Sequence, residues 1–295
     1  MLRRQLFHLG LVAVLAPKIV AAAEPKVLFE KQSPYNTVVV TEDEQGLRTL
    51  MFERGGARQS VVKPGDPDHI ELAYARVMPV GLALVKAPER ILIVGLGGGT
   101  IPNFLHKHYP QARIDVVDID PVVVEAAKKF FNFREDANLR AYVADGRRFI
   151  EDCREPYDAI LLDAFGSDSI PYHLATQEFL RAVRAAVRPK GIVLANVWSS
   201  GANPLYASMV RTYQDVFDDL YIIDVFSTGN RILMALPRKE PIQADDLVQK
   251  ARTLSQQRRF PFDLGEPTAQ GFRSPGTEET GGEVLKDKKP ARKAG

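Results

Sequence analysis

The sequence is poor in the residue types that build disulfide frameworks and metal clusters. Its 295 residues include one cysteine and five histidines. The single Cys153 excludes an intrachain disulfide framework and a cysteine zinc cluster. His106 and His108 are two apart on a predicted helix, so their side chains point to different sides and do not chelate one metal. We therefore predict no metal site.

A strong charge of either sign is also missing. The 39 basic and 37 acidic side chains leave a net charge of +2. No basic stripe with interleaved aromatic residues indicates a nucleic-acid partner. With 45% hydrophobic residues, the chain can bury a sizeable core in one or two domains.

Long apolar runs are absent as well, and the one candidate lies near the N-terminus. The stretch from Leu6 to Ala16 is too short for a stable membrane span. It follows Arg3-Arg4 and precedes the small residues Ala21 to Ala23, which is the outline of a secretory signal. We therefore expect a periplasmic or secreted protein; a cytoplasmic protein with an N-terminal extension is the alternative.

What the sequence does contain is a buried strand that ends in glycines. Ile91 to Val94 is a run of branched apolar residues, typical of a parallel strand buried on both faces. The glycines of the turn after it have no Cβ atom, so a ligand can approach the backbone there. The N–H groups at the start of the next helix would face that ligand. The glycines are Gly95, Gly97, Gly98 and Gly99.

A second strand, from Arg113 to Val117, ends at Asp118, whose carboxylate can accept hydrogen bonds from both hydroxyls of a ribose. The turn lacks the lysine of a nucleotide-triphosphate loop, and Thr100 departs from the dinucleotide fingerprint. A nucleoside without phosphates, such as S-adenosylmethionine, requires only the turn and the carboxylate. A tight connection without any ligand is the alternative interpretation.

The central region alternates strands and helices, as a parallel sheet requires. Strands are predicted at 91–95, 113–118, 140–144, 157–163, 192–197, 221–226 and 231–236. Helices are predicted near 101–109, 121–131, 146–153, 175–188 and 204–217. A short turn at 227–230 makes the last two strands an antiparallel pair. This ending favours a methionine-derived cofactor over NAD, because NAD enzymes usually keep the last strand parallel.

We predict an α/β fold: a doubly wound, mostly parallel, seven-stranded sheet of Rossmann-like type with a small N-terminal β domain. A helix over 69–85 is expected to lead into the glycine strand, and another is expected over 244–258. The polar C-terminal segment is expected to be disordered. The predicted organisation is a leader (1–23), an N-terminal β region (24–68), a nucleoside-binding catalytic domain (69–240), a C-terminal helix and extension (241–273) and a disordered tail (274–295).

The order of these motifs resembles the spermidine synthase family of aminopropyltransferases, which have the fold of class I S-adenosylmethionine-dependent methyltransferases. The resemblance covers roughly residues 27 to 240. It rests on Gly-Leu-Gly-Gly-Gly (95–99), Val-Val-Asp-Ile-Asp (116–120), Val-Ala-Asp-Gly (143–146) and Tyr-Asp-Ala-Ile-Leu-Leu-Asp (157–163).

The resemblance implies roles for individual residues. Asp118 would hold the ribose, Asp145 and Gly146 would read the adenine amino group, and Gln59 would contact the cofactor. Asp163, at the end of the fourth strand, would lie beside the reacting amine, where a carboxylate can orient the amine and accept its proton. Helix or turn capping is the structural alternative for Asp145 and Asp163.

Two departures from the family pattern leave the donor open. Spermidine synthases carry an acidic residue in the glycine turn for the amino group of decarboxylated S-adenosylmethionine, and we assign that position to Thr100. Their second aspartate after the fourth strand, which grips the diamine, is not at the matching position here, and the spacing of Asp168 does not fit it. Both features also resemble a divergent branch that includes methyltransferase-like proteins.

We therefore predict transfer of an aminopropyl group from decarboxylated S-adenosylmethionine to a polyamine. Methyl transfer from S-adenosylmethionine is the first alternative, and a non-catalytic nucleoside-binding protein is the second. The expected partner is a small-molecule amine, with no nucleic acid. Because relatives commonly dimerise, a homodimer is possible.

Overall fold

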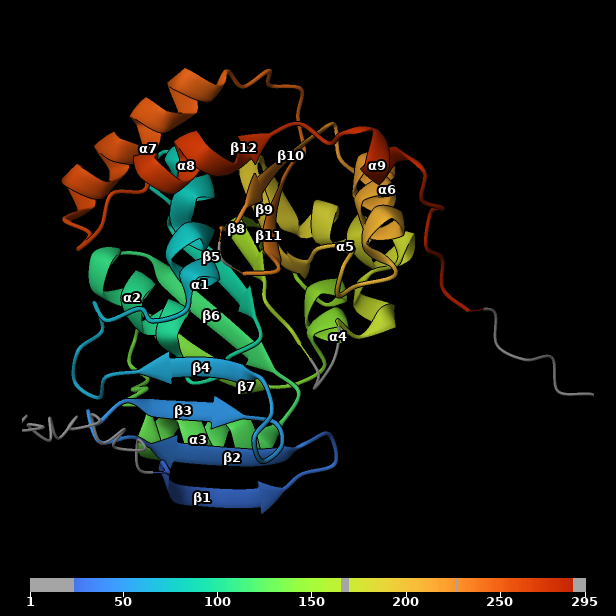
Figure 1. Cartoon of the computed structure of the whole chain (residues 1–295). Coiled ribbons are helices and arrows are strands. Elements are labelled where there is room, and N and C mark those ends of the chain that lie inside the picture. Colours follow the sequence, from blue (N-terminus) through green and yellow to red (C-terminus); the bar gives the residue numbers. More distant parts are fainter. Residues whose placement is uncertain (1–23, 166–169, 227, 289–295) are drawn as a thin grey trace, which may run out of the picture.

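The computed structural model describes residues 24–165, 170–226 and 228–288, arranged around two β-sheets (Figure 1). The predicted leader (1–23) and Asp168 lie outside the described residues. The smaller sheet is an antiparallel meander, as expected for the N-terminal β region. Its strands are β1 (Lys26–Gln32), β2 (Thr37–Glu42), β3 (Arg48–Met51) and β4 (Arg58–Val62).

The larger sheet has the order β12-β10-β11-β9-β8-β5-β6-β7. Its first five strands in the chain are parallel, and β11 runs antiparallel between β9 and β10. This confirms the predicted doubly wound fold with its antiparallel ending. The strands are β5 (Arg90–Val94), β6 (Arg113–Asp118), β7 (Leu139–Val143), β8 (Tyr157–Leu162), β9 (Val187–Trp198), β10 (Asp219–Asp224) and β11 (Asn230–Leu236).

An eighth strand, β12 (Phe272–Arg273), pairs with β10 at the edge of the sheet. Seven strands were predicted, and a two-residue strand carries no alternating pattern that sequence could reveal. The pairing is supported by side chains, because the Phe272 ring stacks on Tyr221 at 5.3 Å.

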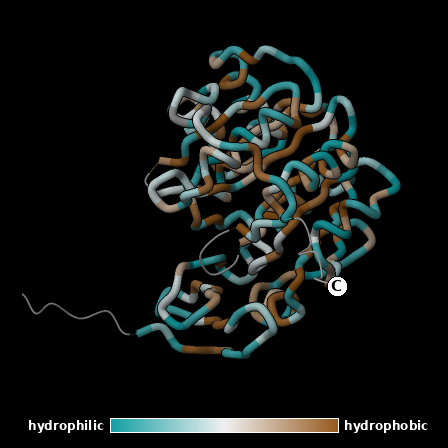
Figure 2. Tube along the Cα trace, turned by 90° about the vertical axis from the view of Figure 1, so that its right-hand side faces the viewer, coloured by the Kyte–Doolittle hydropathy of each residue, from teal (hydrophilic) through white to brown (hydrophobic). Residues whose placement is uncertain are grey.

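The helices between the strands lie close to their predicted positions. They cover both faces of the sheet, and the central strand β5 divides its side chains between two apolar cores. Ile91 and Ile93 face one core, and Leu92 and Val94 face the other. Figure 2 shows these apolar strands running through the interior. The helices are α2 (Thr100–His108), α3 (Pro121–Phe130), α4 (Gly146–Glu151), α5 (Gln177–Ala186) and α6 (Tyr206–Val216).

The helix predicted over 69–85 is wrong in length and type. The α-helix α1 covers only Ala73–Val77, and the chain continues as the 3-10 helix η1 (Met78–Leu84). Pro79 has no N–H for an α-helical hydrogen bond. Gly81 lies so close to β9 that a Cβ atom would be 2.2 Å from the Leu194 side chain. Close packing on the sheet therefore overrides the apolar periodicity.

The N-terminal sheet packs on α3. Ser33 donates a hydrogen bond to the Asp120 carboxylate at 2.5 Å, and Asp120 also caps α3 by accepting from Val122 N at 2.9 Å. The Phe29 and Phe130 rings lie 5.3 Å apart across the same interface. One buried carboxylate thus joins the small sheet to the end of β6.

The C-terminal region contains the predicted helix α7 (Ala244–Arg258) and a second helix, α8 (Gly265–Gly271). The disorder expected for 274–295 is wrong for 274–288, which forms α9 (Thr277–Thr280) and packs on the sheet domain. Glu279 is fully buried among Tyr206 and Arg273. A few specific contacts hold this polar segment, and overall composition does not reveal them. No helix in the described ranges is long and apolar enough to cross a membrane.

Leu285→Ala tests whether the C-terminal segment contributes to stability. Leu285 is only 8% exposed and packs in the core beside α5 and α6, so we expect the free energy of unfolding to fall by about 2–3 kcal/mol. Urea denaturation measures this change. Leu205→Ala, at a leucine that is 40% exposed, is the control and should change it by less than about 0.5 kcal/mol. Equal effects of the two changes would contradict the packing.

Candidate active site

A pocket of about 800 Å³, including its opening to solvent, lies at the carboxyl ends of β5, β6 and β8. The strand order reverses between β5 and β8, and ligands of open α/β sheets bind at such a point. The N-terminal sheet closes one side with Asn36, Phe52, Gln59 and Ser60. Pro171, His173 and Leu174, in and beside the 3-10 helix η2 (Tyr172–Leu174), contribute to the wall beyond β8.

Two glycines of the turn after β5 line this pocket. Gly95 has φ +102°, and a Cβ atom there would lie 2.3 Å from the Asp163 carbonyl oxygen. Gly97 has φ +52°, and its Cβ would lie 2.6 Å from Ser60 Oγ. Both the backbone conformation and the close approach of neighbouring strands therefore require glycine.

Gly98 and Gly99, which were also predicted to bind the cofactor, are not among the residues that line this pocket. Gly98 N donates to Ser60 Oγ at 2.8 Å, and a Cβ atom at 98 would meet the Phe131 ring at 2.8 Å. A Cβ at Gly99 would meet Phe133 at 3.0 Å. These glycines allow the turn to pack between the two sheets.

Thr100 also lies away from the pocket. It is the first residue of α2 and lines a separate small cavity with His69, Asn103 and Phe131. The position that the resemblance assigned to the amino group of the donor therefore does not line this pocket. The turn residues at the pocket are Gly95, Leu96 and Gly97, and none of them is acidic.

Asp118 lies at the end of β6, where the sequence predicted it. Its carboxylate accepts from Leu96 N at 2.8 Å and from Asp120 N at 2.9 Å, so it shapes the glycine turn as well as facing the pocket. Burial raises the pKa of Asp118, the backbone N–H groups oppose this shift, and the charge of Asp120 adds to it.

Asp145, Gly146 and Gln59, for which the resemblance implied contacts with the donor, all line the pocket. Asp145 is also the N-cap of α4, and its Oδ1 accepts from Arg147 N at 2.8 Å. Its Oδ2 lies 3.5 Å from His173 Nε2. Asp145 therefore does cap α4, as the structural alternative expected, and its second carboxylate oxygen remains turned toward η2.

Asp163 follows β8 and has two side-chain partners. Asn196 Nδ2 donates to Oδ1 at 2.8 Å, and the Tyr74 hydroxyl donates to Oδ2 at 3.3 Å. Burial raises the pKa of Asp163 from its ordinary value of 3.8 to about 7, although both hydrogen bonds oppose the shift. Burial and the charge of Asp163 raise the pKa of Tyr74 well above its usual value, so Tyr74 remains a donor.

Neither Tyr74 nor Asn196 is among the site residues that the family resemblance implied. Asn196 accepts in turn from Asn230 Nδ2 at 2.9 Å, which fixes its amide against Asp163. The position of Asn196 near the carboxyl end of β9 could have indicated a place at the site, because the carboxyl ends of the parallel strands meet at the same edge of the sheet. Tyr74 lies on α1, and only the packing of that helix on the sheet brings it to Asp163.

The pocket is acidic. Its described lining contains the carboxylates of Asp118, Asp120, Asp145 and Asp163, one histidine, and no lysine or arginine. Such a lining suits a cationic ligand. Within the described residues, no group of three or more histidine, cysteine or acidic side chains could hold a metal ion.

Comparisons with known proteins agree with this geometry. The spermine/spermidine synthase domain matches residues 71–218. A polyamine aminopropyltransferase of Vibrio vulnificus is 36% identical over 236 residues, which is 78% of each chain. The chain belongs to the spermine/spermidine synthase family.

The family also has relatives with another named activity. The bovine eEF1A lysine and N-terminal methyltransferase is 31% identical over 215 residues; these cover 66% of this chain but only 31% of the larger protein. Aminopropyltransferases and methyltransferases are both transferases, so this member of the spermine/spermidine synthase family is an enzyme of transferase type.

Solved structures give the same fold. Human methyltransferase-like protein 13, in complex with SAH, aligns with a TM-score of 0.60 and 28% identity over 65% of this chain and 95% of its own. A spermidine synthase in complex with the transition-state analogue AdoDATO aligns with a TM-score of 0.67 and 21% identity over 87% and 88%. At 21% identity, the similarity to this spermidine synthase shows only a shared fold.

The raised pKa of Asp163 predicts a pH-dependent cost to stability. The Asp163 carboxyl group binds its proton more tightly in the folded protein than in the unfolded chain. The free energy of unfolding therefore falls as the pH rises from 3.8 to about 7. Asp163→Asn removes this loss. We expect Tm of the variant minus Tm of the wild type to increase between pH 5 and pH 7.5, measured by calorimetry. A difference that stays constant over this range would contradict the raised pKa.

Proposed function

We propose that this protein transfers an aminopropyl group from decarboxylated S-adenosylmethionine to an amine acceptor of the polyamine class. The observation that carries the proposal is the acidic pocket with Asp163 at its inner edge. The donor bears a sulfonium and an ammonium group, and the acceptor is an amine. Neutralisation by carboxylates therefore favours both substrates.

In this proposal the donor nucleoside lies between the two sheets. The Gly95–Gly97 turn faces the sulfonium side chain, Asp118 binds the ribose hydroxyls, and Asp145 with Gly146 reads the adenine. Gln59 contacts the donor from β4. A carboxylate retains acceptor sites after accepting two backbone N–H groups, so the contacts of Asp118 with the turn leave room for the ribose. The SAH and AdoDATO complexes of the two structural neighbours support a donor of this kind.

The chemical step is a displacement at carbon. The neutral amine nitrogen attacks the aminopropyl carbon next to the sulfonium, the new C–N bond forms, and the C–S bond breaks with its electron pair passing to sulfur. 5′-Methylthioadenosine leaves, and the proton lost by the nitrogen passes to Asp163. A carboxylate with a pKa of about 7 is suited to this transfer near neutral pH. Tyr74 and Asn196 hold it in place.

Methyl transfer from intact S-adenosylmethionine is the second candidate. It is favoured by the similarity to the eEF1A methyltransferases and by the absence of an acidic residue between Gly95 and Thr100. The lining offers no lysine or arginine for the methionine carboxylate, which is why we place this candidate second.

Turnover with the two donors separates the candidates. The protein is incubated with a diamine and either decarboxylated or intact S-adenosylmethionine, and products are identified by mass spectrometry. We expect 5′-methylthioadenosine and an aminopropylated amine, with kcat/KM at least tenfold higher for the decarboxylated donor. S-adenosylhomocysteine as the main product would replace the proposal with methyl transfer. Binding of either donor without any product would indicate a non-catalytic nucleoside-binding protein.

Asp163→Asn tests the proton acceptor. The amide is close in shape but does not take up the proton, so we expect kcat to fall about 10²–10⁴-fold. The affinity for 5′-methylthioadenosine should remain within about twofold, because Asp163 does not contact the nucleoside in this proposal. Unchanged turnover would remove Asp163 from the chemical step.

Asp118→Asn tests the nucleoside site. Loss of one or two charge-assisted hydrogen bonds to the ribose should weaken binding of 5′-methylthioadenosine by about 1.5–3 kcal/mol, measured by calorimetry. Asp115→Asn, on the same strand but away from the pocket lining, is the control. If Asp118→Asn binds as tightly as the wild type, the ribose assignment is wrong.

A further inference from the structure

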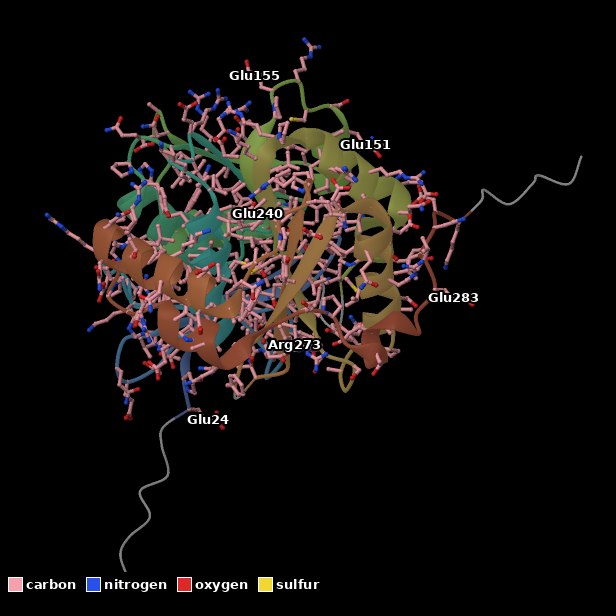
Figure 3. The ribbon with its side chains drawn as sticks, turned by 90° about the horizontal axis from the view of Figure 1, so that it is seen from above. Glu24, Glu151, Glu155, Glu240, Arg273 and Glu283 are labelled. Carbon is pink, nitrogen blue, oxygen red and sulfur yellow. The ribbon has the colours of Figure 1, made fainter. Side chains whose placement is uncertain are left out.

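The segment that follows α9 runs along the outer side of α6 and α5. We call residues 281–288 the C-terminal strap; it starts near Glu283 at the edge of the molecule (Figures 1 and 3). Its backbone is bonded to both helices, because Leu285 N donates to Thr212 Oγ1 at 2.9 Å and Leu285 O accepts from Gln177 N at 2.7 Å. These contacts anchor the strap before it reaches the pocket side.

Beyond this anchor, Asp287 forms a bidentate ion pair with Arg147. Oδ1 and Oδ2 accept from the two guanidinium nitrogens at 2.8 and 2.6 Å, and Oδ1 also accepts from Thr176 Oγ1 at 2.8 Å. The backbone N–H of Asp287 donates to Glu178 at 2.9 Å. The guanidinium group lowers the pKa of Asp287. The pair joins α4 to the start of α5.

The same region of the strap holds η2. The Tyr172 hydroxyl donates to the carbonyl of Lys286 at 3.0 Å, and Lys288 Nζ lies 5.5 Å from the centre of the Tyr172 ring. Arg147 also donates to the His173 carbonyl at 3.3 Å. None of the three residues of η2 is fully buried. Tyr172 and Leu174 pack partly buried against the apolar core, and the polar contacts with the strap add to this packing.

Both elements joined by the strap line the nucleoside end of the pocket. Arg147 follows directly after Asp145 and Gly146, and η2 places His173 opposite Asp145, 3.5 Å away. A shift of η2 would open the gap between these two side chains. The distance across this end of the pocket therefore depends on a residue near the C-terminus of the chain.

We infer that Asp287 is a positioning residue. Its pair with Arg147 holds α4 and, through the His173 carbonyl, η2, and the bond from Tyr172 to Lys286 adds to this, so that the C-terminal strap clamps α4 and η2 around the adenine of the donor. The inference rests on the proposed function, because the nucleoside of the donor is the ligand assigned to this end of the pocket. Pre-organised walls bind more tightly, since less ordering is needed when the ligand arrives. The strap therefore sets donor affinity and leaves the chemical step unchanged.

Asp287→Asn tests the clamp. We expect the Kd of 5′-methylthioadenosine, measured by calorimetry on the full chain, to rise at least fivefold. KM for the donor should rise in parallel, while kcat and KM for the amine stay within twofold. Tyr172→Phe, which removes only the hydroxyl bond to the strap, should give a smaller rise in the same direction.

Asp218→Asn is the matched control. Asp218 pairs with Arg184 at 2.6 Å, the two side chains are 34% and 39% exposed, and the pair lies at the far end of α5; Asp287 is similarly exposed at 37%. The control should leave Kd unchanged. If both variants change Kd equally, or if Asp287→Asn leaves it within twofold of the wild type, Asp287 is only structural.

Hydrogen exchange separates this inference from the proposed function. The amides of Leu174 and Ala175, which are bonded within η2, should exchange faster in Asp287→Asn than in the wild type, while those of β8 stay protected. If the wild type binds no nucleoside, the proposed function fails, and unchanged exchange of η2 would separately overturn the clamp.

Discussion

The contact between Gly95 and the backbone of Asp163 is the constraint on which the site depends. It lies where the strand order reverses, and it brings the end of β5 against the end of β8 with no room for a Cβ atom. Because the chain turns sharply there, Asp118 can bond to the N–H of Leu96. Asp118, the glycine turn and Asp163 thereby face one crevice.

Four carboxylates in one pocket repel one another, and the hydrogen-bond donors that stabilise the negative charge differ from one carboxylate to the next. Asp118 accepts backbone N–H groups, while Asp120 and Asp145 cap helices. Among the described residues, Asp163 receives only the Asn196 amide and the Tyr74 hydroxyl, and these two hydrogen bonds do not offset its burial. Its pKa of about 7 therefore places its proton uptake near neutral pH.

The parallel sheet, its antiparallel ending and the strand-end acids could be predicted from sequence, because a buried strand and the residue that ends it are close together in the chain. Gly98 and Gly99 were assigned to the ligand, and Thr100 to the family position for the amino group of the donor, because sequence gives the order of residues in the turn but not the directions in which they face. The two glycines point to Phe131 and Phe133, which sequence does not place. Tyr74 was missed for the same reason, since its partner is 89 residues away.

The amino-acid composition of the C-terminal segment does not predict that it is ordered. Residues 274–288 have too few apolar side chains to form a core of their own, so a disordered tail was a reasonable expectation. The segment needs no core of its own, because Leu285 enters an existing one and Asp287 meets a guanidinium group held by α4. Arg147 directly follows Asp145 and Gly146 in the pocket wall, so one ion pair connects this C-terminal segment to the wall of the pocket.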